Sequence, residues 1–167
     1  MNIVLIGYRG TGKSAIARML SKELNFPVFN MDEEITKKAV MSIPEIVEKF
    51  GWDSFRDMES EVAEQVSNLD NHIIDTGGGV ILRDKNVKNL RKNSKVFWLK
   101  ADISTIVKRI KHGTHRPSLT EGKSFVEEIE EVLIQRKEKY GKAADYIIDT
   151  SKLSPSDVAE KIVSLMR

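Results

Sequence analysis

Residues 7–14 carry the side chains with the clearest chemical meaning in this chain. They run Gly-Tyr-Arg-Gly-Thr-Gly-Lys-Ser and fit the phosphate-loop pattern G-x-x-x-x-G-K-[ST] at every fixed position. The glycines let successive backbone N–H groups point at phosphate oxygens, Lys13 can reach the β- and γ-phosphates, and the Ser14 hydroxyl can ligate Mg²⁺. The pattern therefore predicts binding of a nucleoside triphosphate. The predicted nucleotide contacts are Gly10, Thr11, Gly12, Lys13, Ser14 and Ala15.

A glycine turn beside a chance lysine is the alternative explanation of this stretch. The flanking sequence argues against it. Residues 2–6 are predicted to form a short buried strand, since residues 3–6 are apolar, and residues 15–24 place Ile16, Leu20 and Leu24 on one face of a helix. Strand, loop and helix thus follow one another in the order that a phosphate loop requires.

Asp32 is the first candidate for chemistry on the group that accepts the phosphate. It follows a predicted strand at residues 26–30, and ligands of open parallel sheets bind outside the carboxyl ends of the strands. A carboxylate there could orient or deprotonate an acceptor hydroxyl. Asp32 could equally be the N-cap of the charged helix that follows, and the two roles are compatible.

Gly77, Gly78 and Gly79 follow a third predicted strand at residues 72–75. Successive glycines cost conformational entropy, so they need a physical reason. A wide surface loop is one such reason. Close approach of a ligand to the backbone is the other, and the position at the carboxyl end of a strand favours it.

Three arginines stand where a guanidinium group could meet an anion. Arg136 lies on the apolar face of a predicted helix, so it either snorkels past the core or points into a cleft. Arg56 can form a weak surface pair with Glu59 at the i,i+3 spacing. A carboxylated acceptor would give Arg56 and Arg136 a shared purpose, because guanidinium groups bind carboxylates bidentately. Arg116 lies in the irregular stretch 112–124, where it is either solvated or part of a lid that closes over phosphates.

The elements that must position these residues alternate along the chain. Apolar strand-like runs are separated by helical patterns, which predicts an α/β fold with a mainly parallel sheet. The predicted strands are residues 2–6, 26–30, 72–75, 95–99 and 145–149. The predicted helices are residues 15–24, two segments within 32–69 that Gly51 separates, a helix from Asp102 to Ile110, residues 125–140, and a C-terminal helix opened by Ser154 and Pro155.

Length and composition set the outer limits. The 167 residues predict a single domain, residues 1–167, with a substantial core. The net charge of +2 gives no argument for a nucleic-acid or membrane partner, and no apolar stretch approaches the length of a membrane span. The absence of cysteine excludes disulfides and cysteine-ligated zinc. Because no signal-peptide pattern opens the chain, a cytoplasmic protein is expected.

In combination, these motifs resemble those of the shikimate kinases, which are similar to the nucleoside monophosphate kinases. The resemblance extends over essentially the whole chain. It rests on the phosphate loop 7–14, Asp32, Phe55-Arg56, Gly77-Gly78-Gly79, Arg116-Pro117 and Arg136-x-x-x-Tyr140, in this order. It implies the P-loop three-layer fold, in which helices flank a five-stranded parallel sheet of order 2-3-1-4-5. An acceptor-binding helical part at about 32–60 and a lid at about 112–124 are implied as well.

The resemblance also implies the reaction. ATP with Mg²⁺ would donate a phosphoryl group to the 3-hydroxyl of shikimate, giving shikimate 3-phosphate and ADP, as part of aromatic amino-acid and chorismate biosynthesis. Arg109 would pack near adenine, and a monomer is implied. The implied catalytic residues are Lys13, Asp32 and Arg116. The implied acceptor contacts are Asp32, Arg56, Gly77, Gly78, Gly79 and Arg136, with the two arginines on the shikimate carboxylate.

The chain departs from the family pattern at Asn30, where shikimate kinases usually have an acid associated with Mg²⁺. Asn30 keeps an acceptor oxygen but loses the charge. Asp75 ends the third predicted strand, where the family often has a small residue. Other phosphate-loop enzymes have a metal-associated aspartate at such a strand end, so Asp75 is a candidate to share a Mg²⁺ site with Ser14 and Asn30. An ordinary strand-end aspartate is the alternative.

Two other functions are compatible with the sequence. A related kinase that acts on another hydroxy acid, such as gluconate, would use the same arginines, although Phe55-Arg56 and the triple glycine favour shikimate. A nucleotide-binding module without catalysis is supported only by the acid lost at Asn30. Acceptor-dependent formation of ADP discriminates among the three.

Overall fold

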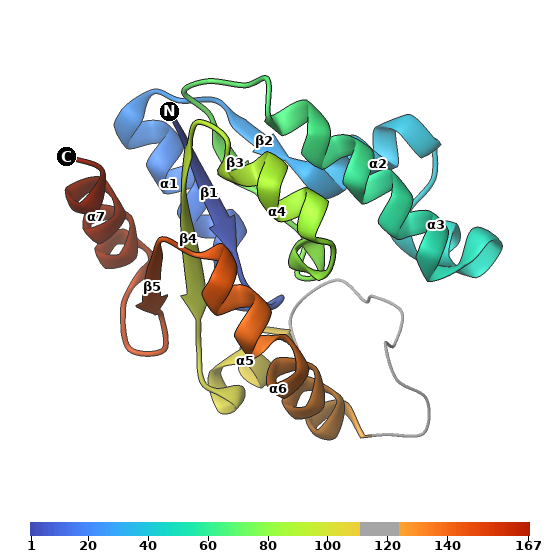
Figure 1. The fold of residues 1–167 in the computed structure, drawn as a ribbon. Coiled ribbons are helices and arrows are strands. Elements are labelled where there is room, and N and C mark those ends of the chain that lie inside the picture. The colour runs from blue at the N-terminus through green and yellow to red at the C-terminus, as the bar shows by residue number, and fades with distance from the viewer. Residues whose placement is uncertain (111–123) are drawn as a thin grey trace.

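The central sheet confirms the predicted fold class and strand order. In the computed structural model, all strands of a five-stranded sheet run parallel in the order β2-β3-β1-β4-β5 (Figure 1). The strands are β1 Asn2–Ile6, β2 Val28–Asn30, β3 Ile73–Asp75, β4 Ser94–Lys100 and β5 Tyr146–Asp149. The structure describes residues 1–110 and 124–167.

Helices cover both faces of this sheet, with α1 and α7 on one side and α3 and α4 on the other (Figure 1). The helices are α1 Lys13–Leu24, α2 Met31–Ala39, α3 Ile43–Val66, α4 Asp84–Arg91, α5 Ile103–Ile110, α6 Phe125–Ala143 and α7 Pro155–Met166, with a 3₁₀ turn η1 at Val80–Leu82. Side chains of β1 alternate between the faces as a strand requires: Ile3 and Leu5 pack with α1 and α7, whereas Val4 and Ile6 pack with α3 and α4. All of β1 is buried, as expected for a central parallel strand.

Helix α4 and the turn η1 were not predicted. The sequence of α4 is mostly polar, and of its residues only Asn86 and Leu90 are buried. The apolar periodicity that predicts a helix is therefore too weak to be recognised. The segment is held instead by tertiary contacts, among them the hydrogen bond from Asn86 Nδ2 to Val80 O at 3.0 Å.

Gly51 was predicted to separate two helices, and the structure confirms a break in the helix at this residue. The chain continues helically on both sides of Gly51 within α3, and Gly51 alone has non-helical backbone angles, φ 85° and ψ 170°. It therefore forms a kink, since a positive φ is accessible to glycine at little cost. Elsewhere the predicted elements shift only at their ends: α6 continues to Ala143, and β2 begins at Val28.

Polar side chains cap the starts of α3, α5 and α7. Ser154 and Asp157 form a complete capping box at the start of α7, and the Ser42 hydroxyl accepts a hydrogen bond from Glu45 N–H at the start of α3. Asp102 accepts from the Thr105 N–H at 2.9 Å before α5. Hydrogen bonds from Thr105 and Ser104 lower the pKa of Asp102 to about 2.

One prediction falls on residues that the structure does not describe. Arg116 and nearly all of the predicted lid at 112–124 lie outside the described residues. Within residues 1–110 and 124–167, no helix combines the length and the apolar character needed to cross a membrane.

Candidate active site

A cavity of about 680 Å³ lies along the carboxyl edge of the sheet, where the predicted site residues were expected to meet. The phosphate loop leaves β1 there, Asn30 ends β2, and Asp75 ends β3. The cavity is lined by Arg9, Gly10, Gly12, Lys13, Ser14, Ala15, Arg18, Asn30, Asp32, Asp75, Thr76, Gly77, Gly78, Arg109 and Ile110. Residues far apart in the sequence thus line one polar pocket.

The phosphate loop has the backbone conformation that its glycines permit. Gly10 and Gly12 have φ values of 79° and 96°, a region that side chains with a Cβ rarely adopt. Gly12 precedes α1, so the free N–H groups of the first helical turn face the loop's concavity. The Lys13 ammonium group lies inside the loop and donates to Gly7 O at 2.7 Å and to Tyr8 O at 3.0 Å.

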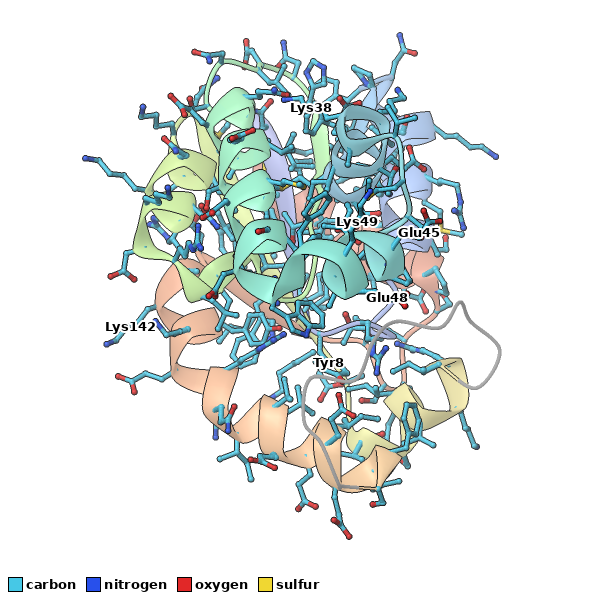
Figure 2. All side chains as sticks on the ribbon, turned by 90° about the vertical axis from the view of Figure 1, so that its right-hand side faces the viewer. Tyr8, Lys38, Glu45, Glu48, Lys49 and Lys142 are labelled. Carbon is cyan, nitrogen blue, oxygen red and sulfur yellow. The ribbon has the colours of Figure 1, made fainter. Side chains whose placement is uncertain are left out.

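Tyr8 anchors the loop to the helices beneath it. Its ring is 2% exposed and packs with Ile106 of α5 and with Ile129 and Val132 of α6. In Figure 2 it lies in the interior, between α3 and the α5–α6 layer, whereas Lys38, Glu45, Glu48 and Lys49 project from the outer surface of α2 and α3. The phosphate loop is therefore held against α5 and α6 through the Tyr8 ring.

Ser14, Asp75 and Asn30 form a compact group of oxygen donors. The Ser14 hydroxyl donates to Asp75 Oδ2 at 2.7 Å, and Asn30 Nδ2 approaches the same oxygen at 3.4 Å. Asn30 and Asp75 are register partners on the neighbouring strands β2 and β3, which explains why their side chains meet. The three candidate metal residues thus lie together beside the phosphate loop, and their role as Mg²⁺ ligands stays a prediction.

Burial raises the pKa of the Asp75 carboxyl above its usual value. The positive charge of Lys13 and the hydrogen bond from Ser14 act in the opposite direction, while the carboxylates of Asp32 and Glu33 add to the increase. Partial burial therefore destabilises the negatively charged form of Asp75. A cation bound beside it would relieve that cost.

Asp32 lies in the cavity but is not the helix cap that the sequence allowed. Asn30 is the N-cap of α2, because its Oδ1 accepts from Glu33 N–H at 3.1 Å. Asp32 stands in the first turn, and its side chain lies against Gly77, where a Cβ would be only 3.0 Å from Asp32 Oδ1. The carboxylate is thus directed at the glycine loop by the cap that precedes it.

Arg56 pairs with Glu59, but the pair is buried and not on the surface as the sequence suggested. Arg56 Nη1 and Glu59 Oε1 are 2.9 Å apart, and the Glu59 side chain is 1% exposed. The guanidinium group also lies over the rings of Trp52 and Phe55, with centroid distances of 5.3 and 5.2 Å. Glu59 and the two rings together hold the arginine in one orientation.

The triple glycine lets these side chains approach the backbone. A Cβ on Gly79 would collide with the Arg56 guanidinium, and a Cβ on Gly78 would be 3.6 Å from Arg136 Nη1. Tyr140, one turn after Arg136 on α6, donates to Gly78 O at 2.5 Å. Arg136 itself is 7% exposed, so it points inward from its helix. In the described chain the groups that approach these glycines are its own side chains. Close approach of a ligand to this backbone, the explanation favoured from the sequence, stays a prediction.

Arg109 of α5 reaches the phosphate loop from the other side. Its Nη1 donates to Gly10 O at 3.2 Å and to Thr150 Oγ1 at 3.1 Å, and its Nη2 donates to Thr150 O at 3.1 Å. Thr150 follows β5 and is 2% exposed. The residue predicted to pack near adenine thus also ties three elements together.

Glu59 and Thr150 are site residues whose roles the sequence interpretation missed. A signal for Glu59 was present, since residues 55, 59, 62 and 66 recur at helical spacing and all are buried on one face of α3. Thr150 stands at the carboxyl end of a predicted strand, the edge where ligands of parallel sheets bind. Within the described residues, no three His, Cys, Asp or Glu side chains form a metal-binding group.

A family model described as shikimate kinase matches residues 9–167. Among curated proteins, a shikimate kinase of Thermodesulfovibrio yellowstonii is 44% identical over 97% of this chain and 92% of the relative. A shikimate kinase of Caldicellulosiruptor bescii is 38% identical over 98% of this chain and 94% of the relative.

Solved structures agree with these sequence relatives. A shikimate kinase of Acinetobacter baumannii in complex with shikimate superposes with a TM-score of 0.92 at 30% identity, covering 99% of this chain and 92% of that one. A shikimate kinase of Aquifex aeolicus gives a TM-score of 0.82 at 30% identity, covering 99% and 96%. The similarity therefore includes the sheet, the flanking helices and the edge on which the cavity lies.

Proposed function

The chain belongs to the shikimate kinase family, and from that premise we propose how its residues transfer a phosphoryl group from ATP to the 3-hydroxyl of shikimate. The products are shikimate 3-phosphate and ADP, in the biosynthesis of aromatic amino acids. The observation that carries the assignment of residues is the placement of Arg56 and Arg136 against the glycine loop that borders the phosphate cavity. Two guanidinium groups and a phosphate loop thus share one edge of the sheet.

On the donor side, the backbone N–H groups of residues 10–15 bind the phosphates of ATP, and Arg109 lies beside the adenine. Lys13 now donates to two loop carbonyls, and its ammonium group moves to the β- and γ-phosphates when they are present. This exchange keeps the ammonium group hydrogen-bonded in both states. Charge on the transferred group is thereby neutralised without a large rearrangement of the loop.

On the acceptor side, Arg56 and Arg136 hold the carboxylate of shikimate: Arg56 is partly buried and held by Glu59, and Arg136 is buried and lies beside Gly78. Asp32 accepts a hydrogen bond from a ring hydroxyl and orients the 3-hydroxyl for attack. Gly77, Gly78 and Gly79 leave room for the ring and the γ-phosphate. Catalysis is then mainly positioning and charge neutralisation, as phosphoryl transfer requires.

The donor set around Ser14 fits Mg²⁺. The Ser14 hydroxyl and the Asp75 carboxylate are hard oxygen ligands, and Mg²⁺ is usually held by one or two carboxylates together with substrate phosphates. The Asn30 amide oxygen accepts from Glu33 N–H, so Asn30 is directed at Asp75 by its Nδ2 group. Ser14 and Asp75 would hold the ion, with Asn30 beside them. The ion supplies neutralisation of phosphate charge in the transfer.

Two regions of the chain have proposed roles in binding the substrates. We propose that residues 32–60 form the acceptor-binding part. Arg116, in the predicted lid at 112–124, would add a further positive charge beside the transferred group. Every contact proposed here comes from one chain, so a monomer suffices for activity.

Release of ADP from ATP and Mg²⁺ tests the function directly. Shikimate is expected to stimulate the rate at least a hundredfold over the rate without acceptor, and gluconate is expected to give little stimulation. The readout is coupled ADP formation with each acceptor at saturation. Equal stimulation by gluconate would overturn the acceptor assignment, and no stimulation by either acid would favour a non-catalytic nucleotide-binding module.

Binding of Mn²⁺ with ADP, followed by electron paramagnetic resonance, tests the metal ligands separately from turnover. Asp75→Asn is expected to weaken Mn²⁺ affinity by about 10- to 100-fold, as loss of a ligand or its orienting partner commonly does. Adding Asn30→Asp to Asp75→Asn is expected to recover part of that loss, because the two positions are register partners. Undiminished Mn²⁺ affinity in Asp75→Asn would remove Asp75 from the metal site.

A further inference from the structure

Thr150 is a buried residue that the proposed mechanism does not use. It follows β5 directly and is 2% exposed. Its hydroxyl lies 3.1 Å from Thr11 O and accepts a hydrogen bond from Arg109 Nη1 at 3.1 Å. The hydroxyl therefore joins the strand end, helix α5 and the phosphate loop at one point.

The Thr150 hydroxyl has only one proton to donate, and two carbonyls lie within reach. Lys100 O is 3.3 Å away but already accepts from the Thr150 N–H at 2.7 Å. Thr11 O, at 3.1 Å, is the shorter contact of the two. The Thr150 hydroxyl is therefore assigned as a donor to Thr11 O of the phosphate loop.

Two consecutive backbone carbonyls of the phosphate loop, those of Gly10 and Thr11, accept hydrogen bonds from side chains. Arg109 Nη1 donates to Gly10 O at 3.2 Å, and Thr150 Oγ1 donates to Thr11 O. No peptide bond in the described chain is cis, and in a trans peptide the C=O and the following N–H point in opposite directions. Fixing the carbonyls of Gly10 and Thr11 toward α5 and β5 therefore turns the N–H groups of Thr11 and Gly12 the other way.

These two N–H groups belong to the cradle that the phosphate-loop pattern assigns to the nucleotide phosphates. Gly12 has a φ of 96° and no Cβ to resist rotation, so its peptide plane needs an external constraint. We propose that Thr150 is a positioning residue for the nucleotide: its hydroxyl, together with Arg109, fixes the peptide planes whose N–H groups bind the phosphates. Thr150 does not itself contact the phosphates. This inference rests on the proposed nucleotide site.

Comparison of ADP with adenosine separates the phosphate cradle from the base site. Thr150→Val removes the hydroxyl at nearly constant volume and is expected to raise the dissociation constant of ADP about tenfold, which corresponds to loss of about one hydrogen bond. Thr150→Ser keeps the hydroxyl and is expected to stay within about twofold of the parent. Adenosine, which has no phosphates, is expected to bind the parent and both variants equally. Isothermal titration calorimetry gives all of these constants.

Steady-state kinetics provide the second readout. In Thr150→Val the KM for ATP is expected to rise about tenfold while the KM for shikimate stays unchanged, because only the donor cradle is loosened. Ser94→Ala is the matched control: the Ser94 hydroxyl also donates to a backbone carbonyl, Lys92 O at 2.8 Å, but it stands at the start of β4, the end away from the cavity. Its constants should equal those of the parent.

Three results would overturn the inference: unchanged ADP affinity in Thr150→Val, equal losses in Thr150→Val and Thr150→Ser, or a parallel loss of adenosine affinity. If Thr150→Val does not fold, Thr150→Ala is compared with Thr150→Ser by the same criteria. Failure of the proposed function has a different signature. The parent protein would then fail to bind ADP or to respond to shikimate, whereas failure of this inference leaves the parent active and the variants equal to it.

Discussion

At the scale of single residues, burial of the Asp75 carboxyl in the candidate active site affects the free energy of unfolding. Its raised pKa means that the folded chain keeps this proton to higher pH than the unfolded chain, whose carboxyl titrates near the usual value of 3.8. Between that value and the raised pKa the folded state binds more protons. Stability therefore falls as the pH rises through this window, so burial of Asp75 makes the metal-free fold less stable at higher pH.

Asp75→Asn is accordingly expected to raise the midpoint of thermal unfolding at pH 7 in the absence of metal and nucleotide. The gain should shrink as the pH falls toward about 4, where the parent carboxyl is also protonated. Calorimetric melts across this pH range measure the difference, with Glu160→Gln on the exposed face of α7 as a control for charge removal. A variant that is less stable than the parent at pH 7 would contradict this account.

At the scale of elements, the sequence predicted what local pattern controls and missed what tertiary contact controls. The phosphate loop and the start of α7 follow from motifs a few residues long, whereas the strand order was implied by the resemblance to the shikimate kinases. Helix α4 does not follow from such a motif, because its sequence is polar and its position is set by neighbours. From the sequence, Glu59 was interpreted as a surface partner of Arg56. That interpretation used only the i,i+3 spacing and overlooked the buried face of α3, on which Glu59 lies.

Gly79 connects the loop after β3 to α3, and its replacement tests that contact. Gly79→Ala would place a Cβ on the Arg56 guanidinium, which Glu59 and two rings hold in position. Displacement of this guanidinium is expected to lower kcat/KM for shikimate about a hundredfold, the usual order for a misplaced substrate-binding group. Kinetics at saturating ATP measure it.

Gly141→Ala is the matched control for this substitution. A Cβ at Gly141 meets nothing within 4 Å, and Gly141 stands in the helix α6. It should leave kcat/KM unchanged and stabilise the fold by up to about 1 kcal/mol, because alanine is the better helix former. Equal activity in Gly79→Ala and Gly141→Ala would show that Arg56 does not depend on the space beside Gly79.

At the scale of the whole molecule, the two tryptophans report on different regions. Trp52 stands in the proposed acceptor-binding part, with its ring edge-on to Phe55 at 5.8 Å and 5.3 Å from the Arg56 guanidinium carbon. Trp98 lies in β4 at 8% exposure and stacks on Tyr140 at 5.4 Å. Of the two, Trp52 is the partly exposed tryptophan that lies beside Arg56, the residue proposed to bind the acceptor.

Saturating shikimate is therefore expected to change the tryptophan emission spectrum through Trp52. Trp52→Phe should abolish the change while leaving the emission of Trp98 in place. Titration of both proteins with shikimate in a fluorimeter makes the comparison. A change that persists in Trp52→Phe would assign the signal to Trp98 and to movement of Tyr140.

The pairing of Asn30 with Asp75 across the β2–β3 ladder has a consequence for the history of such sites. Because the two positions are register partners and both line the cavity, an acid at either one lies beside the same space. A lineage that first gains an acid at position 75 and then loses the acid at position 30 keeps a carboxylate beside Ser14 at every step. The opposite order passes through a protein with none. The ladder thus constrains the order in which substitutions accumulate, and not only which residues are tolerated.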